Sequence, residues 1–331
     1  DEETNALVWK YLGYRYDEET GEWDASAVFP KWAKKYPQPP DLIGVTRTYE
    51  RAVDEPVLRA VRANLVAVVD GGLVDSCWRE RVQWTGDLRM SALALRDLAE
   101  AREVVDDYVA RTRGIACGAD EVVIVPGGKP TMFFAILALV NAGDEVIYPN
   151  PGFPIYESMI NFVGGKAVSC PIREENAFAL DPQDVISRIT DKTKMVVLNS
   201  PANPTGGVTG KAELEQICAE LKKHPDIWIL SDEIYSRMLY DGAEHFSPLS
   251  DPELRDRIIL LDGWSKTYAM TGWRLGFGVM RPDLAAQVAK LMVNSNSCSA
   301  AFTQRAGMEA LTGDQSAVDA MLAEFDKRRK L

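Results

Sequence analysis

The sequence predicts an α/β fold built on a large, mostly parallel sheet that is sandwiched by helices. Short apolar runs, such as 122–125, 195–198 and 258–261, alternate with longer segments of helical periodicity, which is typical of βαβ units. Five such runs each end in a polar turn. Because turns at the carboxyl ends of parallel strands meet at one edge of a sheet, we expect a ligand crevice there.

Composition limits the classes of function. The chain has 331 residues, 46% of them hydrophobic, which is enough to bury the core of one large domain and part of another. With Lys+Arg 37 against Asp+Glu 49, the net charge is -12, so neither nucleic acid nor an anionic membrane surface is expected as a partner. No apolar run approaches the ~20 residues of a membrane span.

Cysteines and histidines are few and scattered. The 5 cysteines have no paired spacing, so we expect no disulfide framework, no zinc site and no other metal site. This use of cysteine fits a reducing compartment. We expect the cytoplasm, with a plastid as the alternative. His224 precedes a proline and His245 lies in an Asp-Gly loop, so both are expected to be solvated, and histidine-based catalysis is poorly supported.

The N-terminal region, residues 1–95, has a composition unlike the rest and no fold that we can assign. Its first part is acidic and rich in tryptophan and tyrosine, 34–40 is a charged, proline-rich linker, and 54–69 has the spacing of an amphipathic helix. A helix at 102–114 leads into the first strand of the sheet. We therefore expect the large domain over residues 96–313.

The strand at 122–125 ends in a glycine-rich turn, 126–129, that opens a helix. Pro130 suits the first helical turn, where a missing N–H costs nothing. Backbone N–H groups at the positive end of a helix dipole suit a phosphate. An ordinary strand-to-helix connection explains the same residues, so the turn alone leaves both interpretations open.

The strands at 145–148 and 195–198 both run into proline-rich turns. The first turn holds Phe153 rigidly, so that its ring can stack on a flat heterocycle or pack as a core phenylalanine. The second turn is too polar to continue the sheet and directs the amide of Asn203 across the strand ends, although a plain Asn-Pro turn is the alternative.

The strand at 227–230 is followed closely by a carboxylate, Asp232. A carboxylate is costly to bury without a cation, so this position predicts either a partner such as a protonated ring nitrogen or a simple helix-capping role. Tyr235 follows three residues later.

The strand at 258–261 leads to Lys266, which lies between small and hydroxylic neighbours. A lysine becomes a nucleophile toward an aldehyde when it is partly desolvated and held near another cation. Arg274 can supply that cation and can share a bound dianion with Ser265. A surface lysine after a strand is the alternative for an isolated Ser-Lys pair, but the other four turns argue against it.

Together, these motifs resemble the pyridoxal-phosphate-dependent aminotransferases of classes I and II, the aspartate-aminotransferase-like family, over about residues 102–331. The tetrapeptide Asn-Pro-Thr-Gly at 203–206 matches the hallmark of that family. The resemblance implies the fold of these transferases and pyridoxal 5′-phosphate as cofactor. Because the usual hydroxyl residue of the phosphate turn is absent, the main chain is expected to hold the phosphate. The implied cofactor-binding residues are Gly128, Lys129, Phe153, Asn203, Asp232, Tyr235, Ser265, Lys266 and Arg274.

Each of these residues has an implied role. The backbone of Gly128 and Lys129 contacts the phosphate, together with Ser265 and Arg274. Phe153 stacks on the ring, Asn203 and Tyr235 bind its hydroxyl, Asp232 binds its nitrogen, and Lys266 binds its aldehyde.

The resemblance implies transamination between an amino acid and a 2-oxo acid. Lys266 and Asp232 are the implied catalytic residues, with the lysine acting as base and acid at the substrate alpha carbon. Likeness alone favours aspartate as donor and 2-oxoglutarate as acceptor, and it implies a homodimer. Two alternatives stay open: a carbon-sulfur lyase on the same fold, and a non-catalytic protein that binds pyridoxal phosphate or serves in assembly.

The C-terminal segment, 314–331, departs from the family. Residues 317–329 carry apolar side chains at helical spacing, at Val318, Met321, Leu322 and Phe325. In the family such a helix leads into a small domain with the arginine that binds the substrate carboxylate. We therefore expect an incomplete small domain, no residue in that role, and a chain that binds cofactor but transaminates poorly.

Overall fold

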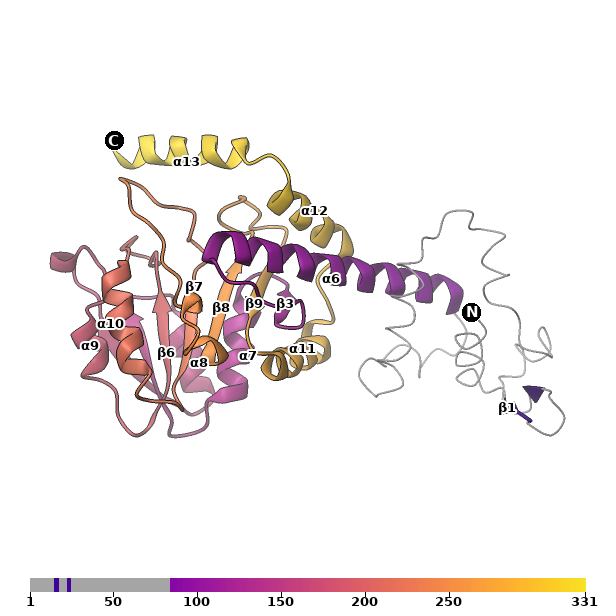
Figure 1. Cartoon of the computed structure of the whole chain (residues 1–331), viewed down its shortest axis with the longest axis horizontal. Helices are drawn as coiled ribbons and strands as arrows, with labels where there is room; N and C mark the ends of the chain where they lie inside the picture. Colours follow the sequence, from indigo (N-terminus) through magenta and orange to yellow (C-terminus); the bar gives the residue numbers. More distant parts are fainter. Residues whose placement is uncertain (1–14, 18–22, 25–83) are drawn as a thin grey trace. The chain divides into compact units, whose positions relative to one another are not determined.

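The computed structural model describes residues 15–17, 23–24 and 84–331 (Figure 1). The linker predicted at 34–40 and the helix predicted at 54–69 lie outside these residues. The chain divides into two compact units, Asp1–Arg96 and Asp97–Leu331. In the first unit, strand β1 (Arg15–Tyr16) pairs antiparallel with β2 (Trp23–Asp24). The predicted end of the large domain at residue 313, with 314–331 as the start of a helix that leads into a small domain, stays a prediction.

A seven-stranded sheet forms the centre of the second unit, with strand order β3-β9-β8-β7-β6-β4-β5. Strand β9 runs antiparallel to both of its neighbours, whereas the strands from β8 to β5 are parallel to one another. The mostly parallel sheet expected from the sequence is therefore confirmed. The strand bounds are β3 Val122–Val125, β4 Glu145–Asn150, β5 Lys166–Pro171, β6 Thr193–Asn199, β7 Trp228–Asp232, β8 Ile258–Gly263 and β9 Gly276–Val279.

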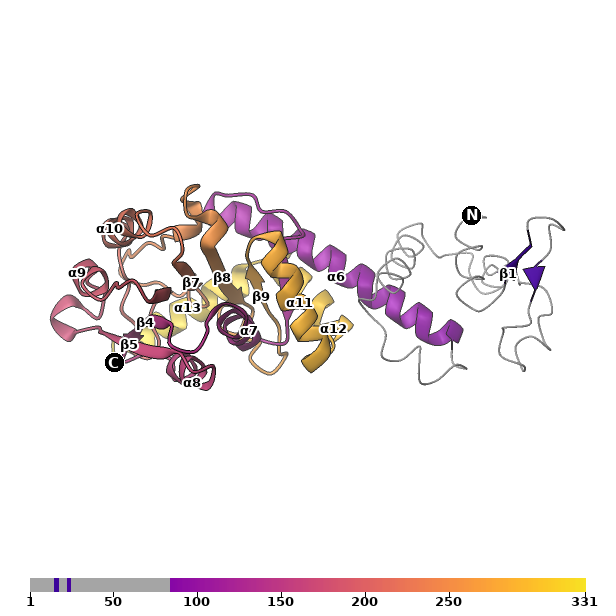
Figure 2. The ribbon, with the colours of Figure 1, turned by 90° about the horizontal axis from the view of Figure 1, so that it is seen from below.

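Helices cover both faces of this sheet (Figure 2). The α-helices are α6 Trp84–Arg113, α7 Lys129–Leu139, α8 Ile155–Phe162, α9 Pro182–Ile186, α10 Lys211–Leu221, α11 Pro282–Asn296, α12 Ala301–Thr312 and α13 Ser316–Arg329. Short 3-10 turns occur at η1 Glu174–Asn176, η2 Pro248–Ser250 and η3 Arg255–Arg257. None of the helices in the described part of the chain is long and apolar enough to cross a bilayer.

Alternate residues of the central strands face opposite helix layers. In β8, Ile258 and Leu260 pack in the apolar cluster that includes α6 and α10 side chains, whereas Ile259 and Leu261 pack in the cluster that includes α7, α8 and α11. Because both faces are covered, the strands are apolar throughout, as in other parallel sheets. Complete burial of one such side chain contributes about 1.5–3 kcal/mol to the free energy of unfolding.

The direction of the strands decides where the polar turns meet. Strands β3, β4, β6, β7 and β8 all point the same way, because β9 is antiparallel to both β3 and β8. The five turns that follow them therefore lie at one edge of the sheet, which we call the carboxyl edge. The crevice expected from the sequence is at this edge.

The C-terminal helix was expected at 317–329 and is present as α13. Val318 is the residue of this helix that is buried, and Phe325 is 42% exposed. The apolar face predicted for the helix is therefore only partly covered.

Candidate functional site

Lys266 and Tyr235 meet at the carboxyl edge from neighbouring strands. Lys266 follows β8 and Tyr235 follows β7, and these two strands are paired in the sheet. The Lys266 Nζ atom lies 5.6 Å from the centroid of the Tyr235 ring, which is cation–π distance. Both side chains are partly buried, so the amine is neither a fully solvated surface group nor sealed in the core.

Asp232 ends β7 as a buried carboxylate, with 3% of its surface exposed. The Tyr156 hydroxyl donates a hydrogen bond of 2.6 Å to its Oδ2, and the backbone N–H of Ile234 donates one of 3.3 Å to its Oδ1. Burial raises the pKa of Asp232 to about 6, even though the hydrogen bond from Tyr156 acts in the opposite direction. Among the residues that the structure describes, no cationic side chain forms an ion pair with this carboxylate, and a cationic partner would stabilise its ionised form.

Asn199, the last residue of β6, connects two of the polar turns. Its Nδ2 donates to the carbonyl oxygen of Asp232 at 3.1 Å, and its Oδ1 accepts from the backbone N–H of Asn203 at 2.9 Å. Neither Asn199 nor Tyr156 was a candidate from the sequence. Both are polar residues in or next to apolar segments of the sequence, which was the signal that could have identified them. Their shared partner, Asp232, is visible only in the fold.

The glycine-rich turn before α7 brings Arg274 to the carboxyl edge. Gly127 has φ of +82°, and a Cβ added there would lie 2.0 Å from Nη2 of Arg274. The Arg274 guanidinium donates to the carbonyl oxygen of Thr271 at 2.7 Å and, weakly, to that of Pro126 at 3.5 Å. A cation thus lies directly beside the turn, as a phosphate site requires.

The start of α7 agrees with the prediction. The helix begins at Lys129 with Pro130 in its first turn, and no side chain caps it at Gly128. Since Gly128 has no side chain to accept from the first backbone N–H groups of the helix, a bound anion can take that place.

Phe153 is positioned as a partly buried ring rather than a fully exposed one. Its edge meets Tyr156 with the ring centroids 6.0 Å apart, and Nζ of Lys129 lies 5.3 Å from its centroid. It packs against the apolar cluster on the α7 side of the sheet. Ser265, which directly precedes Lys266, is partly buried as well. The cofactor roles of all these residues stay predictions.

The expectation that His245 is solvated is wrong. Its side chain is 11% exposed, and its Nε2 lies 2.8 Å from Oε2 of Glu233. The physical reason is that Glu233, next to Asp232, is itself buried and needs polar partners, so the loop after β7 folds back over it. His224 is more open, with 37% of its side chain exposed and Glu220 3.3 Å away.

A buried charge network surrounds Glu233. Arg113 of α6 contacts Oε2 of Glu233 at 3.1 Å and Oδ2 of Asp262 at 2.5 Å. Burial would raise the pKa of Glu233, but the hydrogen bond with His245 and the charge of Arg113 outweigh it and lower the pKa to about 2. The network fixes the residue that directly follows Asp232.

Among the described residues, no group of three or more histidine, cysteine, aspartate or glutamate side chains could hold a metal ion.

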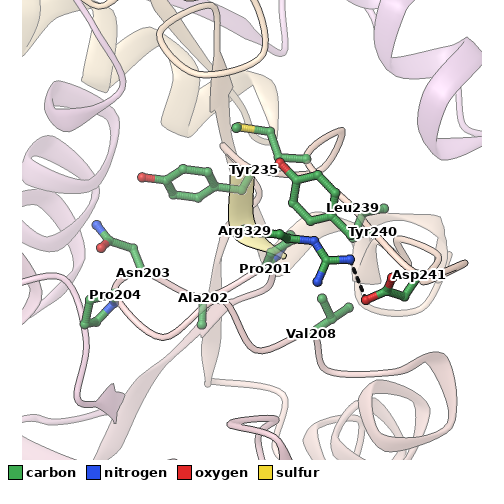
Figure 3. Close-up of a pocket in the computed structure, with 12 residues that line it drawn as sticks. Pro201, Ala202, Asn203, Pro204, Val208, Tyr235, Leu239, Tyr240, Asp241 and Arg329 are labelled. Atoms are coloured by element: carbon green, nitrogen blue, oxygen red, sulfur yellow. Dashed lines mark ion pairs between the residues drawn. The ribbon is translucent and has the colours of Figure 1, made fainter. Parts of the chain in front are cut away.

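A pocket of about 460 Å³ opens beside the candidate residues. The turn after β6, the loop after β7 and one residue of α13 line it (Figure 3). Figure 3 shows the Tyr235 hydroxyl and the Asn203 amide on one side of this pocket, with the guanidinium of Arg329 near its centre. The pocket is therefore continuous with the carboxyl edge.

Comparisons with known proteins separate the two parts of the chain. The family described as "Aminotransferase class I and II" matches residues 78–331, and "Domain of unknown function (DUF1823)" matches residues 1–68. An aspartate aminotransferase of Pyrococcus abyssi is 35% identical over 237 residues, which are 71% of this chain and 61% of the relative. One of Sulfolobus acidocaldarius is 38% identical over 233 residues, 70% of this chain and 57% of the relative.

Solved structures agree with this result. The aspartate aminotransferase of Rhizobium meliloti aligns with a TM-score of 0.68 and 27% identity, covering 88% of this chain and 75% of that one. An aromatic aminotransferase of Pyrococcus horikoshii aligns with a TM-score of 0.68 and 30% identity, covering 85% and 71%. The predicted fold is confirmed by these alignments. The chain spans 61% or less of the length of the two sequence relatives described above.

Proposed function

Since the chain belongs to the class I and II aminotransferase family, we propose that it binds pyridoxal 5′-phosphate at the carboxyl edge and moves an amino group between an amino acid and a 2-oxo acid. Aspartate is the proposed donor and 2-oxoglutarate the proposed acceptor, because the relatives above are aspartate aminotransferases. A homodimer in the cytoplasm or a plastid is part of the same proposal. The observation that carries it is the buried carboxylate of Asp232 beside the turn of Lys266.

The residues at the carboxyl edge fit this cofactor. When bound, pyridoxal phosphate supplies an aldehyde that links to an amine and a protonated ring that withdraws electrons from the substrate alpha carbon. The uncapped start of α7, with Arg274 beside Gly127, suits the phosphate. The buried Asp232 carboxylate forms no ion pair with the described part of the chain, and a protonated ring nitrogen would supply the missing positive charge.

Lys266 is the proposed catalytic base and acid. Its amine would bind the cofactor and, once a substrate amine has displaced it, accept the proton from the substrate alpha carbon at Nζ and return it. The centroid of the Tyr235 ring lies 5.6 Å from Lys266 Nζ, so the ring flanks the amine on one side. Holding the base close to the reacting carbon contributes through proximity.

Asp232 would keep the ring protonated. The hydrogen bond from Tyr156 holds its Oδ2 in place, and the N–H of Ile234 holds its Oδ1. Asn199 donates to the backbone carbonyl of the same residue, so the main chain of Asp232 is held as well as its carboxylate. Such preorganisation suits a group whose task is to stabilise a fixed charge.

A labelling experiment tests the proposal. The purified chain, reconstituted with pyridoxal phosphate, should turn yellow, and borohydride reduction followed by peptide mapping should place the label on Lys266. Lys266→Ala should take up no label, whereas the exposed Lys290→Ala should be labelled like the parent. Label at another lysine, or no visible absorbance after reconstitution, would contradict the assignment.

A further inference from the structure

Arg113, the last residue of α6, is a buried cation that contacts the ends of two neighbouring strands. Its side chain is 1% exposed. Its Nε donates to Oε2 of Glu233 at 3.1 Å, and its Nη2 donates to Oδ2 of Asp262 at 2.5 Å. Glu233 directly follows β7 and Asp262 belongs to β8, so one guanidinium bridges the carboxyl ends of both strands. These strands end in Asp232 and lead to Lys266, respectively.

The remaining contacts of the guanidinium fix its orientation. Its Nη2 also donates to the Ser236 hydroxyl at 3.1 Å, and its Nη1 donates to the Thr112 hydroxyl at 2.7 Å. Its carbon lies 5.4 Å from the centroid of the Tyr108 ring. Because the planar fork of an arginine is pre-organised, it can hold two acceptors in one geometry, which the point charge of a lysine cannot do.

The restraint reaches the backbone on both strands. The backbone N–H of Glu233 donates to the carbonyl oxygen of Leu261 in β8 at 2.8 Å. Asp262 binds Arg113 through Oδ2 and accepts from the backbone N–H of Gly263 through Oδ1, at 2.7 Å. Gly263 ends β8, directly before the turn that carries Lys266. The guanidinium therefore holds the bases of both turns.

We propose that Arg113 is a positioning residue of the candidate site, which sets the spacing between Asp232 and Lys266 through its two carboxylate partners. We call Arg113, Glu233 and Asp262 the arginine clamp. The inference rests on the proposed function, since Asp232 would contact the ring nitrogen of the cofactor and Lys266 its aldehyde. A rigid ring can meet both groups only at one spacing, and a misplacement of about 1 Å can cost roughly a hundredfold in rate.

Stability of the fold alone does not explain the composition of the clamp. Two carboxylates face one guanidinium where burial penalises each of the three charges. An apolar cluster of similar volume is often as stable as a buried ion pair, so the fold does not require charges at this place. Directional bonds between named atoms, however, specify a geometry more narrowly than apolar contacts do.

Arg113→Lys in the full chain tests the clamp, because it keeps a cation beside the carboxylates but loses the fork. With pyridoxal phosphate bound at saturation, the circular dichroism of the cofactor absorption band should weaken, because the ring is no longer held in one orientation. The dissociation constant of the cofactor should rise about tenfold, as for one charge-assisted hydrogen bond. Alpha-proton exchange should fall about a hundredfold.

Hydrogen exchange of the cofactor-free chain, followed by mass spectrometry, gives a measurement that does not depend on the cofactor. In Arg113→Lys, peptides over 231–236 and 262–268 should exchange about tenfold faster, because both strand ends lose a restraint. A peptide over β4, which lies outside the clamp, should exchange as in the parent. A merely structural ion pair would instead change exchange throughout the sheet.

Asp262→Asn is the second variant, and it keeps the test decisive if Arg113→Lys does not fold. The amide has one oxygen where Asp262 uses two, while Arg113 stays paired with Glu233. This variant should show the same changes, and the double variant should add little, because both substitutions break one link. Arg111→Lys is the matched control, at an exposed arginine of the same helix that donates to the carbonyl oxygen of Leu311, and it should match the parent throughout.

Distinct outcomes would overturn the inference. Unchanged dichroism and cofactor affinity in both variants, with a parent that is labelled on Lys266, would refute the clamp and leave the proposed function intact. Additive losses in the double variant would contradict a single link, and faster exchange throughout the sheet would reduce Arg113 to a structural ion pair. A parent without label on Lys266 would refute the proposed function. In that case, faster exchange confined to the two strand ends would still support the clamp, and its absence would refute the clamp as well.

Discussion

Replacing Asp232 by asparagine should stabilise the cofactor-free protein against unfolding. The same change should slow alpha-proton exchange by the protein with bound cofactor. The carboxyl has a pKa of about 6 in the fold against an ordinary value of 3.8, with burial as the main cause. Below pH ~3.8 the group is protonated in both states, and its burial costs little. As the pH rises, the unfolded chain releases its proton first, so the free energy of unfolding falls until the pH passes about 6.

The magnitude follows from that rise of about two pKa units. One unit corresponds to 1.36 kcal/mol, so the ionised carboxylate costs the folded state about 3 kcal/mol at pH 8. The amide can still accept the hydrogen bond from Tyr156, but it has no second oxygen for the N–H of Ile234, which costs about 1 kcal/mol. Asp232→Asn should therefore raise the free energy of unfolding by about 2 kcal/mol at pH 8.

Urea unfolding of the cofactor-free protein at pH ~4.5 and pH 8 measures this effect. The gain in free energy of unfolding of Asp232→Asn over the parent should be largest at pH 8 and smaller at the lower pH. The exposed Asp226→Asn should have the same free energy of unfolding as the parent at both pH values. Pyridoxal phosphate should reverse the order, because a protonated ring nitrogen stabilises the carboxylate and not the amide. Substrate alpha-proton exchange should fall in the variant by about a hundredfold or more. An advantage that does not grow between the two pH values would refute the reasoning.

Two further variants test the surroundings of the site. Arg113→Leu should lower the free energy of unfolding by about 3–5 kcal/mol, because it leaves two buried carboxylates without their cation. Urea denaturation measures this loss, with Arg111→Leu, at an exposed arginine of the same helix, as the control. A loss under about 1 kcal/mol would contradict the prediction. Gly127→Ala should weaken the binding of pyridoxal phosphate in a fluorescence titration, because the new methyl group displaces Arg274. Gly143→Ala is the control, because Gly143 has a φ of +91° and open space around the added carbon. It shares the backbone strain of about 1–2 kcal/mol but should keep the affinity for pyridoxal phosphate. Equal losses of this affinity in the two variants would show that the contact with Arg274 is irrelevant.

The order of strands and turns was predictable from local patterns. Apolar runs of strand length, each ending in a polar turn, place Asp232 and Lys266 at the ends of strands whatever the details of packing. Pro130 in the first turn of α7 follows from the conformational limits of proline, and the glycines before it allow the tight turn, in which Gly127 has a positive φ and Gly128 a negative one. Such features depend on a few neighbouring residues, and the sequence therefore determines them by itself.

Contacts between distant segments were decided only by the tertiary structure. Tyr156 meets Asp232 across 76 positions, and Arg113 meets Glu233 across 120, and no periodicity marks such pairs in advance. His245 was expected in water because its loop is polar, yet the buried Glu233 carboxylate draws it inward. Arg329 enters the pocket only because α13 passes over the loop after β7. Buried charge must find its partners wherever the folded chain brings them, so the sequence determines which groups need partners and the fold decides which partners they receive.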